Sequence, residues 1–243
     1  MTAFGKVQCG ATIINYCVEE SDTRKTVALS VSQHKNVKVI VPKGLEKEKI
    51  QQIVQGKVAW ILKKFAWFDR IPSITINRQY KNGETFQYLG RQYRLKIILG
   101  AKQSAAKLVG RYLEISVPDR YCNEKLTDHI KRKVSRWYAK HAKQKFNNKI
   151  LEFSKKFNIL IPTFQVKNLK KRWGSCSSRD YLTLNYRIIM APMSQVEYVL
   201  MHELCHIFCK NHSVKFWEQL RLAMPDYAMR QENLKRDGWG YVL

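Results

Sequence analysis

The sequence has few acidic residues, no long apolar run and no closely paired cysteines, and each shortage excludes a class of protein. No stretch approaches the roughly 18 uninterrupted apolar residues of a membrane helix, and residues 1–9 lack the apolar core of a signal peptide. The 6 cysteines stand apart, with none in a C-x-x-C pair, which argues against a disulfide framework. We therefore expect a cytoplasmic protein without a membrane span, whose cysteines are buried free thiols.

The shortage of acidic residues leaves a large positive charge. The chain has 44 Lys and Arg against 19 Asp and Glu, a formal net charge of +25. Sixteen of the basic residues but only three acids fall in the segment from Arg120 to Arg172. Such an excess attracts polyanions without choosing among them, so nucleic acid is the first candidate partner and an anionic membrane surface is the second. The simpler alternative is a basic protein whose charge serves only its solubility.

Apolar periodicity predicts an α+β fold in two parts. The first part, residues 1–120, is predicted to be a β-rich N-terminal unit with one long helix. Its residues 4–41 alternate as strands do, and residues 46–68 carry an apolar stripe at helical spacing. Further strand patterns occupy 86–90, 93–97 and 112–117.

The second part, residues 121–243, opens with a long basic helix predicted over 123–157. Trp137, Tyr138 and Phe146 lie among its lysines and arginines at helical steps, which favours a role in the core over stacking on bases. Strands are predicted over 163–169 and 182–189, and the segment Trp173–Ser178 between them is typical of a turn.

The residues that carry chemistry are His202, Glu203 and His206, which form an H-E-x-x-H sequence on a predicted helix. A capping-box pattern, Ser194 with Glu197, predicts that this helix begins near Ser194. Histidines four residues apart lie about 40° apart around a helix, so both imidazoles can bind one Zn²⁺ with the glutamate beside the open position. The alternative is a pair of helical histidines that are hydrogen-bonded within a core.

A third ligand has two candidates in the sequence. His212 follows the expected end of the helix, where a turn can bring its ring back to the metal, and Ser213 then begins another predicted helix. Cys209 lies on the same side of the helix as His202, but seven residues along a helix is about 10 Å, which is too far to share one ion. We therefore expect His202, His206 and His212 as ligands and Cys209 as a packed thiol.

Three ligands and an open fourth position predict a hydrolytic mechanism. Zn²⁺ lowers the pKa of its bound water to about 7, and Glu203 would accept the proton as water attacks an amide carbonyl and then deliver it to the leaving amine. Tyr186 and Arg187, on the neighbouring predicted strand, are candidates for stabilising the developing oxyanion, and a structural role is equally open for both.

These residues resemble one known family. His202–His206 with Asn211-His212-Ser213, Arg172-Trp-Gly-Ser-Cys-Ser and Leu184-Asn-Tyr-Arg187 are similar in order and spacing to the YgjP-like metallopeptidases, and more distantly to SprT-like and WLM proteases. The resemblance spans roughly residues 80–224, and Tyr186 stands where the family pattern suggests Trp. It implies a zincin-like minimal metallopeptidase domain within residues 121–243, the three histidines as metal ligands, Glu203 as the catalytic base, and Trp173 and the 184–187 strand beside the cleft.

The sequence therefore predicts a zinc-dependent metallopeptidase, most simply an endopeptidase that cleaves unfolded or extended segments. An extended substrate could pair with an exposed edge of the predicted 163–189 hairpin. Two alternatives stay open: a nucleic-acid-binding module with a structural or vestigial zinc site, and a zinc hydrolase of non-peptide amides. Weak, nonspecific nucleic-acid binding through the basic 120–172 segment is also expected to accompany the peptidase.

Overall fold

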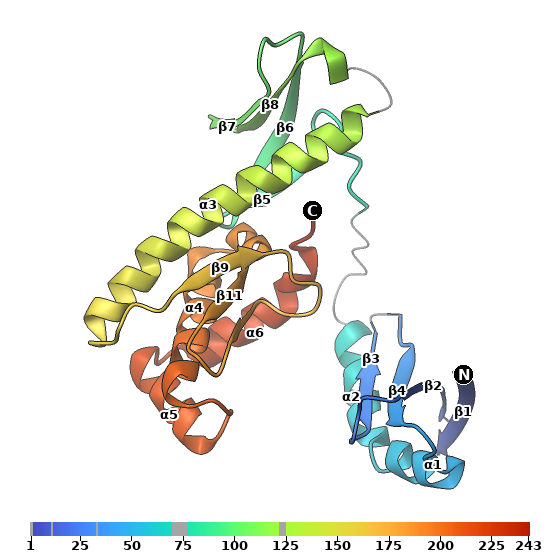
Figure 1. Ribbon diagram of the computed structural model, residues 1–243. Coiled ribbons are helices and arrows are strands. Elements are labelled where there is room, and N and C mark those ends of the chain that lie inside the picture. The colour runs from blue at the N-terminus through green and yellow to red at the C-terminus, as the bar shows by residue number, and fades with distance from the viewer. Residues whose placement is uncertain (1, 11, 33, 70–76, 122–124) are drawn as a thin grey trace. The chain divides into compact units, whose positions relative to one another are not determined.

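A computed structural model describes residues 2–10, 12–32, 34–69, 77–121 and 125–243. The chain forms two compact units, Met1–Thr75 and Ile76–Leu243, each with a hydrophobic core of its own (Figure 1). Helices and small mixed sheets occur in both, which confirms the α+β fold class. The division differs from the predicted units 1–120 and 121–243, because strands within residues 77–121 pack against the long helix of the second unit.

The first unit is a mixed sheet with two helices packed against it. Its strands, in the order β1-β2-β4-β3, are β1 Thr2–Cys9, β2 Thr12–Ser21, β3 Ala28–Val31 and β4 Val37–Pro42. The predicted single helix over 46–68 is instead two helices, α1 Lys47–Gln55 and α2 Val58–Asp69. They are separated at Gly56, a residue type that costs about 1 kcal/mol relative to alanine inside a helix.

The second unit contains two small sheets. The strands of the first, in the order β5-β6-β8-β7, are β5 Thr85–Tyr88, β6 Arg91–Leu99, β7 Ala105–Val109 and β8 Tyr112–Val117. The strands of the second, in the order β10-β11-β9, are β9 Phe164–Lys167, β10 Gly174–Cys176 and β11 Leu182–Asn185. The helices are α3 Leu126–Lys156, α4 Met193–Phe208, α5 Val214–Ala223 and α6 Tyr227–Asp237, with short 3₁₀ helices at Asp119–Tyr121, Tyr186–Met190 (η2) and Gly238–Gly240.

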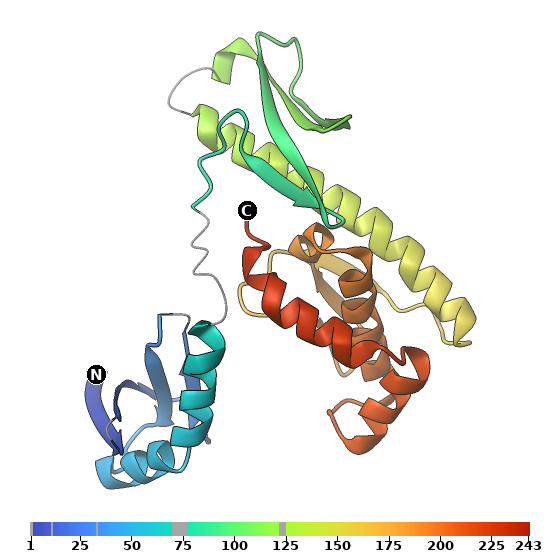
Figure 2. The same ribbon diagram turned by 180° about the vertical axis from the view of Figure 1, so that it is seen from behind.

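Helix α3 connects the two sheets of the second unit. It contacts β7 and β8 along its first half and β9, η2 and α4 farther on (Figures 1 and 2). Trp137, Tyr138 and Phe146 are buried in this packing, and the Tyr138 hydroxyl donates to the Gln87 carbonyl at 2.5 Å. The aromatic residues of the basic helix are therefore core residues, as their spacing predicted.

Two local predictions in the second sheet are wrong. The segment predicted as a turn contains β10, which pairs antiparallel with β11. The strand predicted over 182–189 ends at Asn185, because the Asn185 side chain accepts a hydrogen bond from the Arg187 N–H and begins η2. As a result β9 and β11 are parallel neighbours and not the two arms of a hairpin.

The described cysteines are free thiols that differ in burial. Cys205 and Cys209 are buried as predicted, whereas Cys17 and Cys176 are half-buried and Cys9 is exposed; Cys122 lies outside the described residues. Among the helices that the structure describes, none combines the length and apolar character needed to cross a membrane.

The predicted capping box of α4 is also wrong. The helix begins at Met193, and Pro192 occupies the cap position, where its carbonyl accepts from the Gln195 N–H at 3.0 Å. Glu197 instead lies 2.8 Å from Lys149 Nζ on α3 and 2.9 Å from Arg230 Nη1 on α6. Although burial raises the pKa of Glu197, the hydrogen bonds from these two cations outweigh it and hold the pKa below its usual value. One carboxylate thus links three helices of the second unit.

Replacing Glu197 by Gln should lower the free energy of unfolding of the second unit by about 1–3 kcal/mol at pH 7, because two partly buried cations lose their anion. A group with a lowered folded pKa stabilises above its unfolded pKa of about 4.3 and loses that effect as pH falls. The difference between wild type and variant in urea unfolding should therefore shrink below about pH 4. Glu152→Gln, which removes an exposed partner of Lys149, is the control, and an equal loss in both variants would contradict the assignment.

Candidate metal centre

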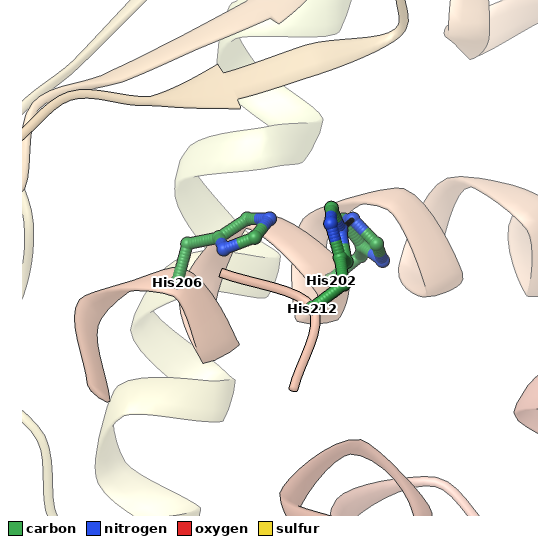
Figure 3. A group of neighbouring side chains, drawn as sticks. All are labelled: His202, His206 and His212. Atoms are coloured by element: carbon green, nitrogen blue, oxygen red, sulfur yellow. Dashed lines mark hydrogen bonds between the residues drawn. The ribbon is translucent and has the colours of Figure 1, made fainter. Parts of the chain in front are cut away.

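Three histidines from α4 and from the segment before α5 converge on one point (Figure 3). His202 and His206 lie one turn apart on α4, and His212 lies just before α5. One ring nitrogen of each lies within 4.8 Å of the others, and the Nε2 atoms of His202 and His212 are 2.9 Å apart. Within the described chain these three residues form the one cluster of potential ligands, and Cys209 is not part of it.

The backbone after α4 orients the His206 ring. His206 Nδ1–H donates to the Cys209 carbonyl at 2.9 Å, which leaves Nε2 with its lone pair free to bind a metal. Hydrogen bonds of this kind fix the tautomer and orientation of histidine ligands. Cys209 therefore takes part in the site through its carbonyl oxygen, while its thiol is buried.

Aromatic rings of α5 support the three imidazoles. Phe216 is fully buried, and its ring centroid lies 4.6–4.9 Å from those of His202, His206 and His212. Trp217 stacks on His212 at 5.6 Å and on Tyr227 at 5.7 Å. The third histidine, which lies outside any helix, is thus held by packing.

Glu203 enters the site from α4 and lies against β10. The space between them is so narrow that a Cβ atom at Gly174 would lie 2.6 Å from Glu203 Cγ and Oε1, a distance that real Cβ contacts do not reach. Only glycine leaves room for this carboxylate. Beside it a cavity of about 340 Å³ is lined by Glu203, His202, Trp173 and their neighbours.

Burial shifts the pKa values of Glu203 and His202 toward their neutral forms. It raises the pKa of Glu203 to about 7, against the opposing effect of the Arg172 cation. Burial, with smaller contributions from the other two histidines, lowers the pKa of His202 to about 3. A neutral imidazole is the form that binds metals, so His202 is in the form that can bind a metal ion over the whole physiological pH range.

The donor set fits a divalent metal ion. Nitrogen ligands of a tetrahedral zinc ion stand about 3.4 Å apart when each is about 2.0–2.1 Å from the metal. This separation lies between the 2.9 Å of His202 and His212 and the 4.8 Å within which all three ring nitrogens lie. In the described structure Glu203 Oε2 is buried with no hydrogen-bond partner. A cation at the three histidines would offset the unfavourable burial of that oxygen.

Of the other predicted site residues, Trp173 lines the cavity, whereas Tyr186 and Arg187 lie elsewhere. Tyr186 is buried in the core, and Arg187 donates from Nη2 to the Leu169 carbonyl at 2.8 Å with its guanidinium 5.8 Å from the Trp173 ring centroid. Arg187 thus packs against Trp173. Neither Tyr186 nor Arg187 is among the residues that line the cavity.

Sequence reasoning did not single out Gly174, Asn185 or Arg172 as parts of the site. Asn185 is fully buried and donates from Nδ2 to the carbonyls of Leu169 and Arg172 at 2.8 and 3.0 Å. It therefore fixes the segment that leads into β10. Asn185 stands among apolar residues of the predicted 182–189 strand, which was a signal, whereas Gly174 fell in a predicted turn; the meaning of both depends on pairing between distant segments.

A family model for a metallopeptidase domain matches residues 25–237. The family is the YgjP-like one, and the chain belongs to it, as the resemblance of its motifs predicted. Among solved structures, the metallopeptidase zymogen jannalysin of Methanocaldococcus jannaschii is similar with 23% identity and a TM-score of 0.33, and the match covers 37% of this chain and 92% of that chain. No curated protein matches the chain. Membership in a metallopeptidase family implies a hydrolase with a divalent metal; the more distant similarity to SprT-like and WLM proteases stays a prediction.

Replacing His212 by Ala should weaken the binding of a divalent metal more than about 100-fold while leaving the fold intact, because a direct ligand is worth more than the outer hydrogen-bond partners whose loss costs about 10–100-fold. Titration with zinc against a chromogenic chelator measures this. His34→Ala, an exposed histidine of the first unit, is the control. Unchanged affinity in His212→Ala would show that this histidine is not a ligand.

Proposed function

We propose that this protein is a zinc-dependent peptidase, most simply an endopeptidase, that cleaves extended segments of polypeptide. The observation that carries the proposal is the convergence of three imidazoles with a buried carboxylate beside one cavity and one edge strand. Tetrahedral sites with three protein ligands leave a position for water or substrate. We also propose a cytoplasmic location, where the free thiols of Cys205 and Cys209 would stay reduced.

Glu203 would act as the general base and acid. Zinc, when bound, polarises a carbonyl and acidifies water. The free oxygen Oε2 of Glu203 accepts a proton from the attacking water and then delivers it to the leaving amine. Because Gly174 has no side chain, the carboxylate can lie against β10 in this position.

The edge of β10 suits an extended substrate. Trp173 O and Ser177 N make their hydrogen bonds toward the β11 side, with Asn185 N and Tyr181 O. Because backbone groups alternate in direction along a strand, the N–H and C=O groups of Gly174 and Cys176 face the open edge of the sheet. A polypeptide that adds to this edge would pass next to Glu203.

The alternatives differ in what they require of Glu203. A nucleic-acid-binding module with a structural zinc site needs no carboxylate that is buried beside the metal without a hydrogen-bond partner. A zinc hydrolase of non-peptide amides would use the same base. The open strand edge beside the site favours a polypeptide substrate over a small amide.

Replacing Glu203 by Gln keeps the shape of the side chain and removes the base, so turnover of an unfolded protein such as casein should fall by about 10²–10⁴-fold while zinc stays bound. Zinc content by atomic absorption and casein cleavage are measured on the same preparation. Glu218→Gln changes an exposed glutamate on α5 and should leave both unchanged. Casein cleavage at the wild-type rate by Glu203→Gln would exclude this mechanism.

A second property, weak nonspecific binding of nucleic acid, is supported by a row of cations on α3. Arg132, Arg136, Lys140 and Lys143 are exposed and lie within about 80° of one another around the helix, over about 16 Å of its length. The ion pairs of α3 with carboxylates are made by Lys149, so in the described structure none of the four has an anionic partner. Proteins bound to the same polyanion would be brought near the cleft.

Changing these four cations together to Ser should weaken binding to a 20-bp duplex and reduce the magnitude of its log–log salt slope by about 3–4, because each phosphate contact contributes about 0.9. Fluorescence anisotropy from low to moderate salt measures both. The matched control changes four exposed lysines of the first unit to Ser: Lys25, Lys47, Lys49 and Lys63. An equal effect of both quadruple variants would show that binding depends on the net charge of the protein and not on this row of cations.

A further inference from the structure

The cavity beside Glu203 has walls of a definite chemical character. The cavity has a volume of about 340 Å³ and lies between β10, α4 and α6. Arg172 and Lys235 contribute cations, Gln231 an amide, and Trp173 and Tyr198 aromatic rings, and Glu203 is the one acidic residue among those that line it. Since Glu203 is already assigned to the proton transfer, the remaining charge of the walls is positive.

The two cations are largely free to bind a ligand. No described carboxylate forms an ion pair with Arg172, which is exposed. Lys235 lies 3.5 Å from Glu232 Oε2, and the side chains of that pair are 51% and 63% exposed. Exposed pairs of this kind contribute little to stability, so a ligand can displace the contact at little cost.

The backbone that carries Arg172 is fixed. Its carbonyl accepts from Asn185 Nδ2 at 3.0 Å, and the next carbonyl, that of Trp173, accepts from the Asn185 N–H at 2.8 Å. Trp173 is held in turn between Arg187 and the ring of Tyr241, 6.0 Å away. A guanidinium on an ordered backbone loses less freedom when it binds, which favours specific recognition.

We propose that this cavity binds a carboxylate of the substrate next to the scissile bond, and that Arg172 is its principal partner, with Lys235 as the second cation. The proposal rests on the proposed peptidase function, and it makes Arg172 a specificity-determining residue. A guanidinium binds a carboxylate through two parallel hydrogen bonds, and the apolar side chains of Val199 and Leu234 in the same wall lower the local dielectric. The carboxylate can be an Asp or Glu side chain or the C-terminus of a peptide.

Binding to the zinc-loaded Glu203→Gln protein tests the proposal without turnover. One set of fluorescent peptides carries Glu or Gln at successive positions and has an amidated C-terminus; a second set has no acidic side chain and ends in a free acid or an amide. At one position, the carboxylate peptide should bind about 10-fold or more tightly than its neutral partner, the usual worth of charged hydrogen bonds. The first set reports side-chain carboxylates and the second reports the C-terminus.

Arg172→Gln should reduce that preference to about twofold or less, and Arg172→Lys should restore part of it, because a lysine supplies charge without the paired hydrogen bonds. Lys235→Gln should reduce it less. Lys155→Gln, an exposed lysine at the end of α3, removes the same charge elsewhere and should have no effect. Circular dichroism and zinc content verify that each variant is folded.

Equal binding of carboxylate and neutral peptides in both sets, or a preference that survives Arg172→Gln and Arg172→Lys unchanged, would overturn the proposal. Its failure is distinguishable from failure of the peptidase function. Cleavage of casein without any carboxylate preference would support the peptidase function and exclude the carboxylate site. A carboxylate preference in a wild-type protein that cleaves no peptide would support the carboxylate site and exclude the peptidase function.

Discussion

Taking His202 and Glu203 out of water requires free energy, and the packing of the second unit supplies it. Burial is the main cause that lowers the pKa of the histidine and raises that of the glutamate, and both shifts favour the neutral form. That preference suits the roles proposed for them, metal binding by His202 as a neutral base and proton transfer by Glu203 near neutral pH. The same burial would be unfavourable in a site without function, because Glu203 Oε2 has no hydrogen-bond partner in the described structure.

The elements around α4 hold the buried side chains of His202 and Glu203 in place. Phe216 forms an apolar surface beneath the three imidazoles, Gly174 lets β10 approach the carboxylate, and Asn185 fixes the segment before β10. Helix α3 lies behind them and is bound to α4 through Lys149 and Glu197. The candidate ligands on α4 and before α5 therefore depend on residues from several distant segments.

Sequence reasoning was strongest where the signal is local. The H-E-x-x-H spacing on a helix depends only on 3.6 residues per turn, and the helices that contain His202 and Phe216 were anticipated. It failed where a distant partner decides. Gly174-Ser-Cys176 has the composition of a turn, yet it becomes a strand because β11 pairs with it. Glu197 has the spacing of a capping box, yet cations on two other helices bind it. The Asn185 side chain that begins η2 after β11 is itself held by carbonyls 13 and 16 residues away.

The close approach of Gly174 to Glu203 also bears on how the small sheet finds its pairing. Strand β10 has 3 residues, and so short an edge strand has few contacts of its own to define its register. A slip by one residue would turn the Trp173 or Ser175 side chain toward α4, where the space beside Glu203 admits only a hydrogen atom. The shifted pairings are thereby excluded by steric overlap. The helix that carries His202 and His206 thus selects the register of its neighbouring strand, and the candidate site helps to specify the fold that holds it.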